Sequence, residues 1–549
     1  MIDEKNEHPS PILLLLVIMS SAQFIFTLDT TFMNVSITTL VKDLNTTVSG
    51  VQGAITFYAL VMAAFMIAGA KVGDIIGRKR AFVIGLIVYG IGSLITGLAP
   101  NLPVLILGWS VLEGLGAALV MPAMISLVIS NFEPGVDRMR AYAVIPAAAA
   151  IGAAAGPIIG GFLTSYLSWR LGFLMEVLVV IFILFMRGRI KDAPLESGMR
   201  PKFDYAGLVL SVAGLGILVY GIILANTYGF FKCRVPFTIA GKQVLAIGDI
   251  SPTILFVIVG LVIIGLFVLW EILWHRRGKS TLISPELLKN MAVVCGISTN
   301  MFQYFLMAGA IFSLSLFAQI VLGYDAFTAG LTILPLSISV FLVAAAGARL
   351  AKRFYPKRII QVGFIVMLVG TALLGLGMGK NISGADFIPS LLVLGAGLGL
   401  VASQLNNIQQ SAVEPEQTSE TSGLNYTFQN LGTSLGTAIA GALIITILIT
   451  TSPSLIQQST VLTPDQQASV EQYMNDRAQK ASSESLDSFL QGQPPEVAQE
   501  VESISVSAQR KALGAEIILL SILAAFGFLA TLGLPKRKIE ETAALDNVA

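Results

Sequence analysis

Fourteen long apolar runs limit what this chain can fold into. Each has about 20 residues, the length a helix needs to cross the hydrocarbon core of a bilayer. Continuous runs of this length do not fit the alternating ten-residue strands of a membrane barrel. We therefore expect an all-α integral membrane protein with 14 transmembrane helices. The runs lie near residues 11–34, 50–69, 81–99, 103–127, 141–163, 169–186, 205–225, 253–274, 292–321, 327–348, 358–379, 387–408, 427–450 and 513–534.

The shortage of charge supports this interpretation. Only 12% of the 549 residues are charged, against about 25% in ordinary soluble domains. So few charges cannot cover the surfaces of several soluble domains, and the 55% hydrophobic content argues against disorder. The net charge of +1 gives no sign of nucleic-acid binding. The two cysteines, Cys233 and Cys295, are too few for a disulfide framework or a four-ligand zinc site.

The basic residues indicate the orientation. With the N-terminus placed in the cytoplasm, most of the 34 Lys and Arg fall in loops on the cytoplasmic side. The first apolar run follows an acidic segment with Asp3, Glu4 and Glu7, whereas a cleaved signal peptide has a basic start. We expect a multi-pass protein of the inner or plasma membrane with both termini cytoplasmic.

Internal repeats divide the chain. Gly69-Ala70 and Lys79-Arg80 recur as Gly347-Ala348 and Lys357-Arg358, and the Gly-rich segment 152–161 resembles 432–441 at nearly the same offset. Two parallel six-helix halves, with two inserted central helices, are an architecture of transporters. The expected segments are a cytoplasmic N-tail 1–10, an N-terminal six-helix bundle 11–187, a linker 188–290 with two inserted helices and an external loop 226–252, five helices of a C-terminal bundle 291–450, an extracytoplasmic loop 451–511, a last helix 512–534 and a cytoplasmic C-tail 535–549.

Two external loops carry local signals. Residues 235–244 alternate around a Gly and indicate a β-hairpin. In the second loop, Thr463-Pro464-Asp465 and Pro494-Pro495-Glu496 are typical of helix starts. We expect a helical hairpin there, and a polar loop without regular structure is the alternative.

The loop after the second run suggests a gate. Gly77 permits a tight turn, and Asp74 can pair with a nearby Arg or with a helix N-terminus. Breaking those contacts would release a gate on the cytoplasmic side. The alternative is that the basic residues only fix the orientation of the chain in the membrane. The candidate gating residues are Gly73, Asp74, Gly77, Arg78, Lys79 and Arg80.

Small residues in the fifth run suggest a close helix contact. Gly152, Gly156 and Gly160 are four apart, a spacing that lets helix backbones approach closely. Pro157 removes a backbone hydrogen bond and allows a kink, and Gly161 completes the segment. Ordinary small-residue packing is the alternative interpretation.

Together these motifs resemble the major facilitator superfamily, and more narrowly its fourteen-helix drug:proton antiporter family. The loop is similar to G-x-x-x-D-x-x-G-R-[RK]-[RK], with Ala70 for the leading Gly, and 152–161 is similar to the antiporter signature. Further similarity lies in Leu28-Asp29-Thr30-Thr31, Asn34-Val35, Trp169-Arg170, Phe173, Gln319 and Pro335. The resemblance implies export by exchange. The fourth run departs from the family, because Ser110 and Glu113 stand where it carries Arg and Gln.

Three acids lie deep within the runs, without a Lys or Arg at similar depth. An ionisable group inside a span costs a few kcal/mol or more, so Asp29, Glu113 and Glu176 are candidates for proton and substrate binding. A carboxyl bonded to a neighbouring Ser, Thr or Gln is the alternative for each. Glu271 and Glu516 are expected at the interface.

The sequence predicts a proton-coupled multidrug efflux antiporter for lipophilic, cationic compounds. It works by alternating access as a monomer, with the proton as coupling ion and with no cofactor, no metal and no catalytic residue. A transporter of a lipid, peptide or metabolite is the alternative, followed by a membrane receptor or enzyme. The two histidines, His8 and His275, lie outside the bilayer centre, and the chain lacks H-E-x-x-H and nucleotide-loop motifs.

Overall fold

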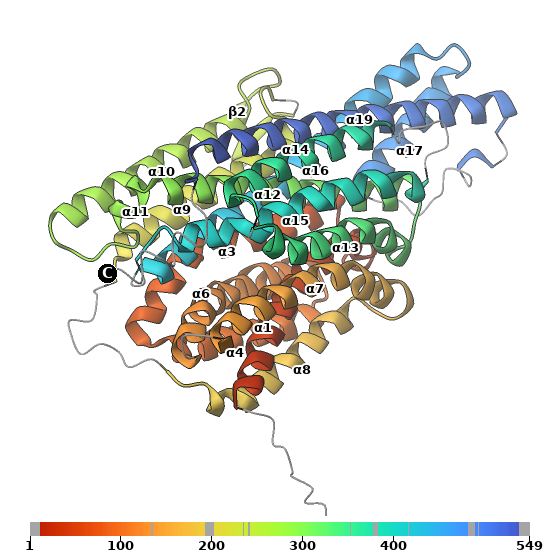
Figure 1. The fold of residues 1–549 in the computed structure, drawn as a ribbon. Coiled ribbons are helices and arrows are strands. Elements are labelled where there is room, and N and C mark those ends of the chain that lie inside the picture. Colours follow the sequence, from red (N-terminus) through yellow and green to blue (C-terminus); the bar gives the residue numbers. More distant parts are fainter. Residues whose placement is uncertain are drawn as a thin grey trace, which may run out of the picture.

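Helices make up nearly all of the described structure (Figure 1). The expected N-tail 1–10, and 537–549 of the expected C-tail, lie outside the described residues. The computed structural model describes residues 11–132, 136–192, 203–233, 235–239, 242–351, 353–376, 383–414, 417–480, 489–491 and 493–536.

The first half of the bundle is built from long helices joined by short turns. Its elements are α1 (Pro11–Val35), α2 (Ile37–Asp43), α3 (Val48–Ile76), α4 (Arg78–Gly97), α5 (Leu102–Leu105), the π-helix η1 (Ile106–Glu113), α6 (Gly114–Asn131), α7 (Val136–Tyr166), α8 (Arg170–Met186) and the 3-10 turn η2 (Arg187–Arg189).

The rest of the chain continues the pattern. Its elements are α9 (Tyr205–Tyr228), β1 (Phe237–Ile239), β2 (Lys242–Leu245), α10 (Pro252–Arg276), α11 (Pro285–Lys289), α12 (Met291–Leu316), the π-helix η3 (Phe317–Val321), α13 (Ala326–Leu350), α14 (Pro356–Leu376), η4 (Gly384–Phe387), α15 (Ile388–Gln410), α16 (Thr418–Gln458), α17 (Pro464–Lys480), α19 (Pro495–Ala530) and η6 (Thr531–Gly533).

The described residues contain 14 helices that are long and apolar enough to cross a membrane. The prediction of 14 transmembrane helices in an all-α protein is therefore confirmed. Below, the end of the bundle at the α3–α4 turn is called the Gly77 side, and the end at α2 is called the Asp43 side.

The packing of the helices follows the internal repeat. Helix α1 packs on α7 as α12 packs on α16, and α4 packs on α6 and α8 as α14 packs on α15 and α19. Helices α9 and α10 pack on each other, and α9 also touches α3 and α16. The two extra helices are thus attached beside two six-helix groups.

Two helix pairs join the six-helix groups: α3 with α16, and α7 with α13 (Figure 1). On the Asp43 side these contacts are reinforced by hydrogen bonds. Gln52 of α3 donates to the carbonyl of Thr437 in α16 over 2.9 Å. The Ser165 hydroxyl of α7 donates to Asp325 Oδ2 over 2.6 Å, and Asp325 caps the N-terminus of α13.

The long segment before the last span contains regular helices. Helix α17 begins at Pro464 and α19 begins at Pro495, directly after the residues expected to start helices. Val470, Val497 and Val501 belong to a small apolar cluster with the end of α16. In the loop between α9 and α10, β1 and β2 pair antiparallel, so the expected β-hairpin is confirmed.

Glu271 and Glu516, expected at the membrane interface, are buried inside the protein, and their depth in the bilayer stays a prediction. Both side chains are only 1% exposed. Glu271 accepts hydrogen bonds from the backbone N–H groups of Leu282 (3.0 Å) and Ile283 (3.2 Å). Glu516 packs on α12 beside Gly309, and the lack of a side chain on this glycine leaves room for the carboxyl group.

Gly330→Ala tests the contact between α7 and α13. A Cβ at Gly330 would overlap the backbone carbonyl of Pro157, which cannot rotate away. We expect a destabilisation of about 1–3 kcal/mol, typical of overpacking. Gly216→Ala is the control, because nothing lies within 4 Å of its new Cβ. Apparent melting temperatures of the purified proteins should fall only for Gly330→Ala, and equal values would contradict the contact.

Candidate functional site

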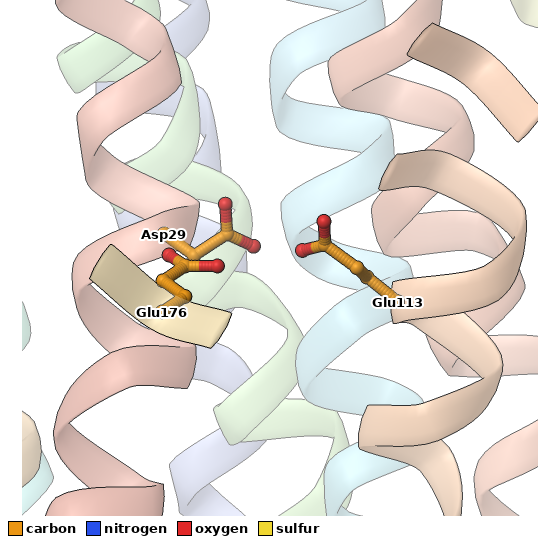
Figure 2. A group of neighbouring side chains, drawn as sticks. All are labelled: Asp29, Glu113 and Glu176. Atoms are coloured by element: carbon orange, nitrogen blue, oxygen red, sulfur yellow. The ribbon is translucent and has the colours of Figure 1, made fainter. Parts of the chain in front are cut away.

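The three acids singled out in the sequence meet at one place. Asp29 lies on α1, Glu113 ends η1 and Glu176 lies on α8. One carboxylate oxygen from each lies within 4.8 Å of the others. Figure 2 shows Asp29 and Glu176 close together, with Glu113 facing them across a gap. The side chains are fully buried, with exposed fractions of 0%, 0% and 2%.

Asp29 is held by an indole. Trp109 Nε1 of η1 donates to both carboxylate oxygens of Asp29, at 2.9 and 3.0 Å. The Trp109 ring stacks on Tyr58 of α3, with ring centres 4.9 Å apart. Three helices therefore fix the orientation of this one carboxylate.

Glu113 and Glu176 are each held on one side only. The Tyr89 hydroxyl (3.0 Å) and the Ser93 hydroxyl (3.2 Å) of α4 donate to Glu176 Oε2. The Thr96 hydroxyl, also on α4, donates to Glu113 Oε1 over 3.3 Å. Glu176 Oε1 and Glu113 Oε2 have no hydrogen-bond partner. Two buried carboxyl oxygens are thus left available for a proton or a ligand.

All donors to the three acids are neutral. In the described part of the chain, no Lys or Arg forms an ion pair with them, and the charged groups that act on Glu113 and Glu176 are the other acids of the centre. Such a centre can take up protons or a cation in place of the missing basic groups. Carboxylates this close together could also ligate a hard metal ion. The expectation that the protein binds no metal therefore stays a prediction.

The π-helix places two of these residues. One turn of η1 carries both Trp109 and Glu113, and π-helical turns are frequent at functional sites. A Cβ on Gly92 of α4 would lie 2.8 Å from the backbone nitrogen of Glu113, so only glycine allows this approach. Ser110, which stands where the family carries Arg, is fully buried and donates to the carbonyl of Ala54 over 2.9 Å. Ser110 therefore contributes packing between η1 and α3 and no charge.

The alternative of a carboxyl bonded to a neighbouring Ser, Thr or Gln holds for Glu176 with Ser93 and for Glu113 with Thr96, but the sequence did not identify which residues hold the acids. These donors and ring partners are Tyr58, Tyr89, Ser93, Thr96 and Trp109. Trp109 offered a signal, because an indole N–H inside an apolar run requires a partner. The two tyrosines and the two hydroxyl residues offered none, because such residues are common in spans.

The glycine segment of α7 packs on two helices. A Cβ on Gly156 would overlap the Thr31 hydroxyl of α1, and one on Gly160 would overlap the Phe32 ring. A Cβ on Gly152 would lie 2.6 Å from the carbonyl oxygen of Phe24. On the other face, a Cβ on Gly161 would lie 2.6 Å from the carbonyl oxygen of Ala326. Helix α7 continues unbroken through Pro157 and contacts both halves.

The loop residues lie at the α3–α4 turn. Gly77 has φ = 100°, a conformation that favours glycine. Arg78 Nη2 and Asp74 Oδ1 form a local ion pair at 3.4 Å. Asp192, which follows α8, accepts a hydrogen bond from the Lys79 backbone over 3.2 Å and so caps α4. Gly73 is buried against α4, whereas Arg80 is exposed.

A carboxyl from the other half lies near this loop. Glu420, in the first turn of α16, interacts electrostatically with Lys71 and Asp74 of α3. It also accepts a hydrogen bond from the Ser284 hydroxyl over 2.9 Å. The candidate gating loop thus faces charged groups of both halves on the Gly77 side.

The Asp43 side is closed by direct hydrogen bonds that link α1 and α2 to α12 and η3. Ser315 donates to the carbonyl of Asn34, and the Thr38 hydroxyl donates to Gln319 Oε1 over 2.9 Å. The desolvation of the exposed Asp325 side chain is slight, and hydrogen bonds from Ser165 and Thr328 outweigh it and lower the pKa of Asp325. The bonds on this side would have to break for the centre to open toward it.

Comparisons with known proteins agree with this architecture. Residues 19–437 match the family model of the Major Facilitator Superfamily. The chain is 29% identical over 438 residues to the probable actinorhodin transporter of Streptomyces coelicolor, covering 78% of this chain and 71% of the relative. It is 27% identical over 432 residues to the multidrug resistance protein Stp of Mycobacterium tuberculosis, covering 79% and 76%.

A solved structure shares the fold. It is that of a bacterial homologue of the human lysosomal transporter Spinster, in an inward-facing and unoccupied conformation. The alignment covers 96% of this chain and 98% of the other, with a TM-score of 0.59 and 14% identity. At this identity the likeness supports the fold and nothing finer.

A double-mutant cycle tests the Trp109–Asp29 bond. Trp109→Phe keeps an aromatic ring but removes the indole N–H donor, and Asp29→Asn removes the carboxylate charge. We expect a coupling free energy of about 1.5–3 kcal/mol in the stability of the purified protein, as for hydrogen bonds to charged groups. Trp169→Phe combined with Asp29→Asn is the control, because Trp169 Nε1 donates to Asp43. Additive effects for the first pair would contradict the bond.

Proposed function

This chain belongs to the Major Facilitator Superfamily, and from that premise we propose that it is a proton-coupled antiporter. It exports lipophilic, cationic compounds by alternating access between two six-helix halves. The observation that carries the proposal is the buried centre of Asp29, Glu113 and Glu176, which contains three acids and no basic partner. One chain supplies the whole centre, so a monomer suffices.

The spacing of the three acids supports exchange of protons. Two negative charges about 4 Å apart repel by roughly 4 kcal/mol at an effective dielectric of about 20. The oxygens here lie within 4.8 Å of one another, so full ionisation without a counter-charge is strongly opposed. Protons relieve the repulsion, and so does a bound cation. Proton and cation therefore compete for the same oxygens, which is the condition for antiport.

The cationic substrate class follows from the same charge balance. A site with only acidic and neutral groups binds a cation by direct attraction and repels an anion. Aromatic rings beside it, Tyr58 and Trp109, can add attraction for a cation. The names of the two relatives, a probable actinorhodin transporter and a multidrug resistance protein, support the export of lipophilic small molecules.

The packing supports alternating access. The α3–α16 and α7–α13 contacts join the halves, and the small residues of α7 allow the backbones to lie close together. Hydrogen bonds close the Asp43 side, whereas the Gly77 side carries the charged groups of the gating loop. We propose that rearrangement of Asp74, Arg78 and Glu420 accompanies the movement of the halves.

The distribution of basic residues supports a defined orientation. We propose that the Gly77 side faces the cytoplasm of a cell with an energised inner or plasma membrane. The β-hairpin, α17 and the start of α19 then lie outside. Protons would enter from the Asp43 side and leave on the Gly77 side.

Glu113→Gln tests the coupling. The amide is isosteric but cannot release a proton, so we expect dye-cation exchange driven by a pH gradient to fall at least tenfold in reconstituted vesicles. Glu271→Gln is the matched control, because Glu271 is equally buried but bonded to backbone N–H groups away from the centre. Transport by Glu113→Gln at the rate of the control would exclude a proton role for Glu113.

Cysteine labelling tests the orientation. In a background with Cys233→Ser and Cys295→Ser, we introduce Thr460→Cys on the Asp43 side or Lys279→Cys on the Gly77 side, both at exposed positions. A membrane-impermeant maleimide applied to intact cells should label Thr460→Cys and leave Lys279→Cys unlabelled until the cells are opened. The reverse pattern would invert the orientation.

A further inference from the structure

A fourth buried acid lies outside the three-acid centre. Glu516 of α19 is 1% exposed, in the second half of the bundle. The Ser313 hydroxyl of α12 is close enough to interact with the carboxyl group of Glu516, but neither carboxyl oxygen forms a hydrogen bond of normal geometry. Glu271, by contrast, is held by backbone N–H groups. Glu516 is therefore a buried carboxyl with no fixed partner.

The position of Glu516 mirrors that of Glu176. Helix α19 packs on α12 and α14 as α8 packs on α1 and α4. Glu516 follows Arg510 by the same six residues that separate Glu176 from Arg170. Its Oε1 lies 3.7 Å from the place a Cβ on Gly309 of α12 would take. The second half thus carries one acid where the first half carries part of its centre.

The surroundings of Glu516 contain no counter-charge. Gly309 of α12 lies beside it, and Thr371 of α14 is hydrogen-bonded to Ser521, five residues further along α19. On α19 itself the nearest basic residues, Arg510 and Lys511, precede it by more than one turn. No charged side chain in the described part of the chain forms an ion pair with Glu516. Binding a proton is the simplest way to neutralise this carboxyl.

Two polar residues of α19, Ser505 and Gln509, lie between the Asp43 side and Glu516. Ser505, Gln509 and Glu516 share one face of α19, because their spacings of four and seven residues match helical turns. Gln509 Nε2 donates to the Ser505 hydroxyl over 2.9 Å. Between Gln509 and Glu516 a small hollow opens, lined by Leu316 and Leu513 among others. Packing is incomplete there, one helical turn (about 5.4 Å) from Glu516.

We propose that Glu516 is a second proton-binding site, located in the C-terminal half, separate from the three-acid centre and loaded from the Asp43 side. This inference rests on the proposed proton antiport. It adds one exchanged proton per cycle to those carried by Asp29, Glu113 and Glu176. Release follows when the movement of the halves lets water reach the carboxyl from the Gly77 side.

The test is the proton:substrate ratio of the full-length protein in vesicles. The substrate gradient at which net flux of ethidium vanishes is measured against imposed pH and voltage gradients. We expect Glu516→Gln to exchange one proton fewer per substrate than the wild type, and Glu516→Asp and Glu271→Gln to keep the wild-type ratio. An unchanged ratio in Glu516→Gln would overturn the proposal.

The outcomes separate the two proposals. If wild-type flux does not respond to the pH gradient, the proton antiport itself fails; if it responds and Glu516→Gln keeps its ratio, only the second site fails. If Glu516→Gln transports too slowly, infrared spectra of the purified proteins decide. The wild type should show a protonated-carboxyl band that Glu516→Gln lacks, and identical bands would overturn the proposal.

Discussion

The burial of three carboxyl groups without a basic partner is the constraint on which the rest of this structure depends. Removing a carboxylate from water is costly unless it is paired or protonated. Here four neutral side chains donate five hydrogen bonds to the acids, and two carboxyl oxygens are left without a partner. The fold therefore keeps three acids together without a basic partner, and in the proposed antiport a proton or a cation supplies the missing positive charge.

Close helix packing makes this arrangement possible. Gly92 lets α4 approach η1 at Glu113, and Gly152 and Gly156 let α7 approach α1 on the other side of Asp29. The stacked Tyr58 and Trp109 fill the remaining space with rings. The same glycine segment of α7 meets α13 of the second half, so the site and the interface between halves share one helix. A movement at that interface can therefore change the positions of the groups around the three acids.

Much of this was predictable from the sequence. The apolar runs gave 14 helices, because length and hydrophobicity alone decide which segments can span a bilayer. Asp29, Glu113 and Glu176 stood out because charges are rare in spans. Their convergence was not predictable, because it depends on which face each of α1, η1 and α8 turns toward the others. The π-helical turn at Trp109 has no sequence signature, and the burial of Glu516 against α12 depends on packing that the sequence does not show.

The central claim is that protons and substrate compete for the three-acid centre. Its most direct test is the number of protons released when a lipophilic cation binds to the purified protein in weakly buffered solution. The account predicts proton release by the wild type that falls as the pH rises, and none by a variant in which Asp29→Asn, Glu113→Gln and Glu176→Gln are combined. Binding of the cation to the wild type without proton release, across the pH range, would contradict it.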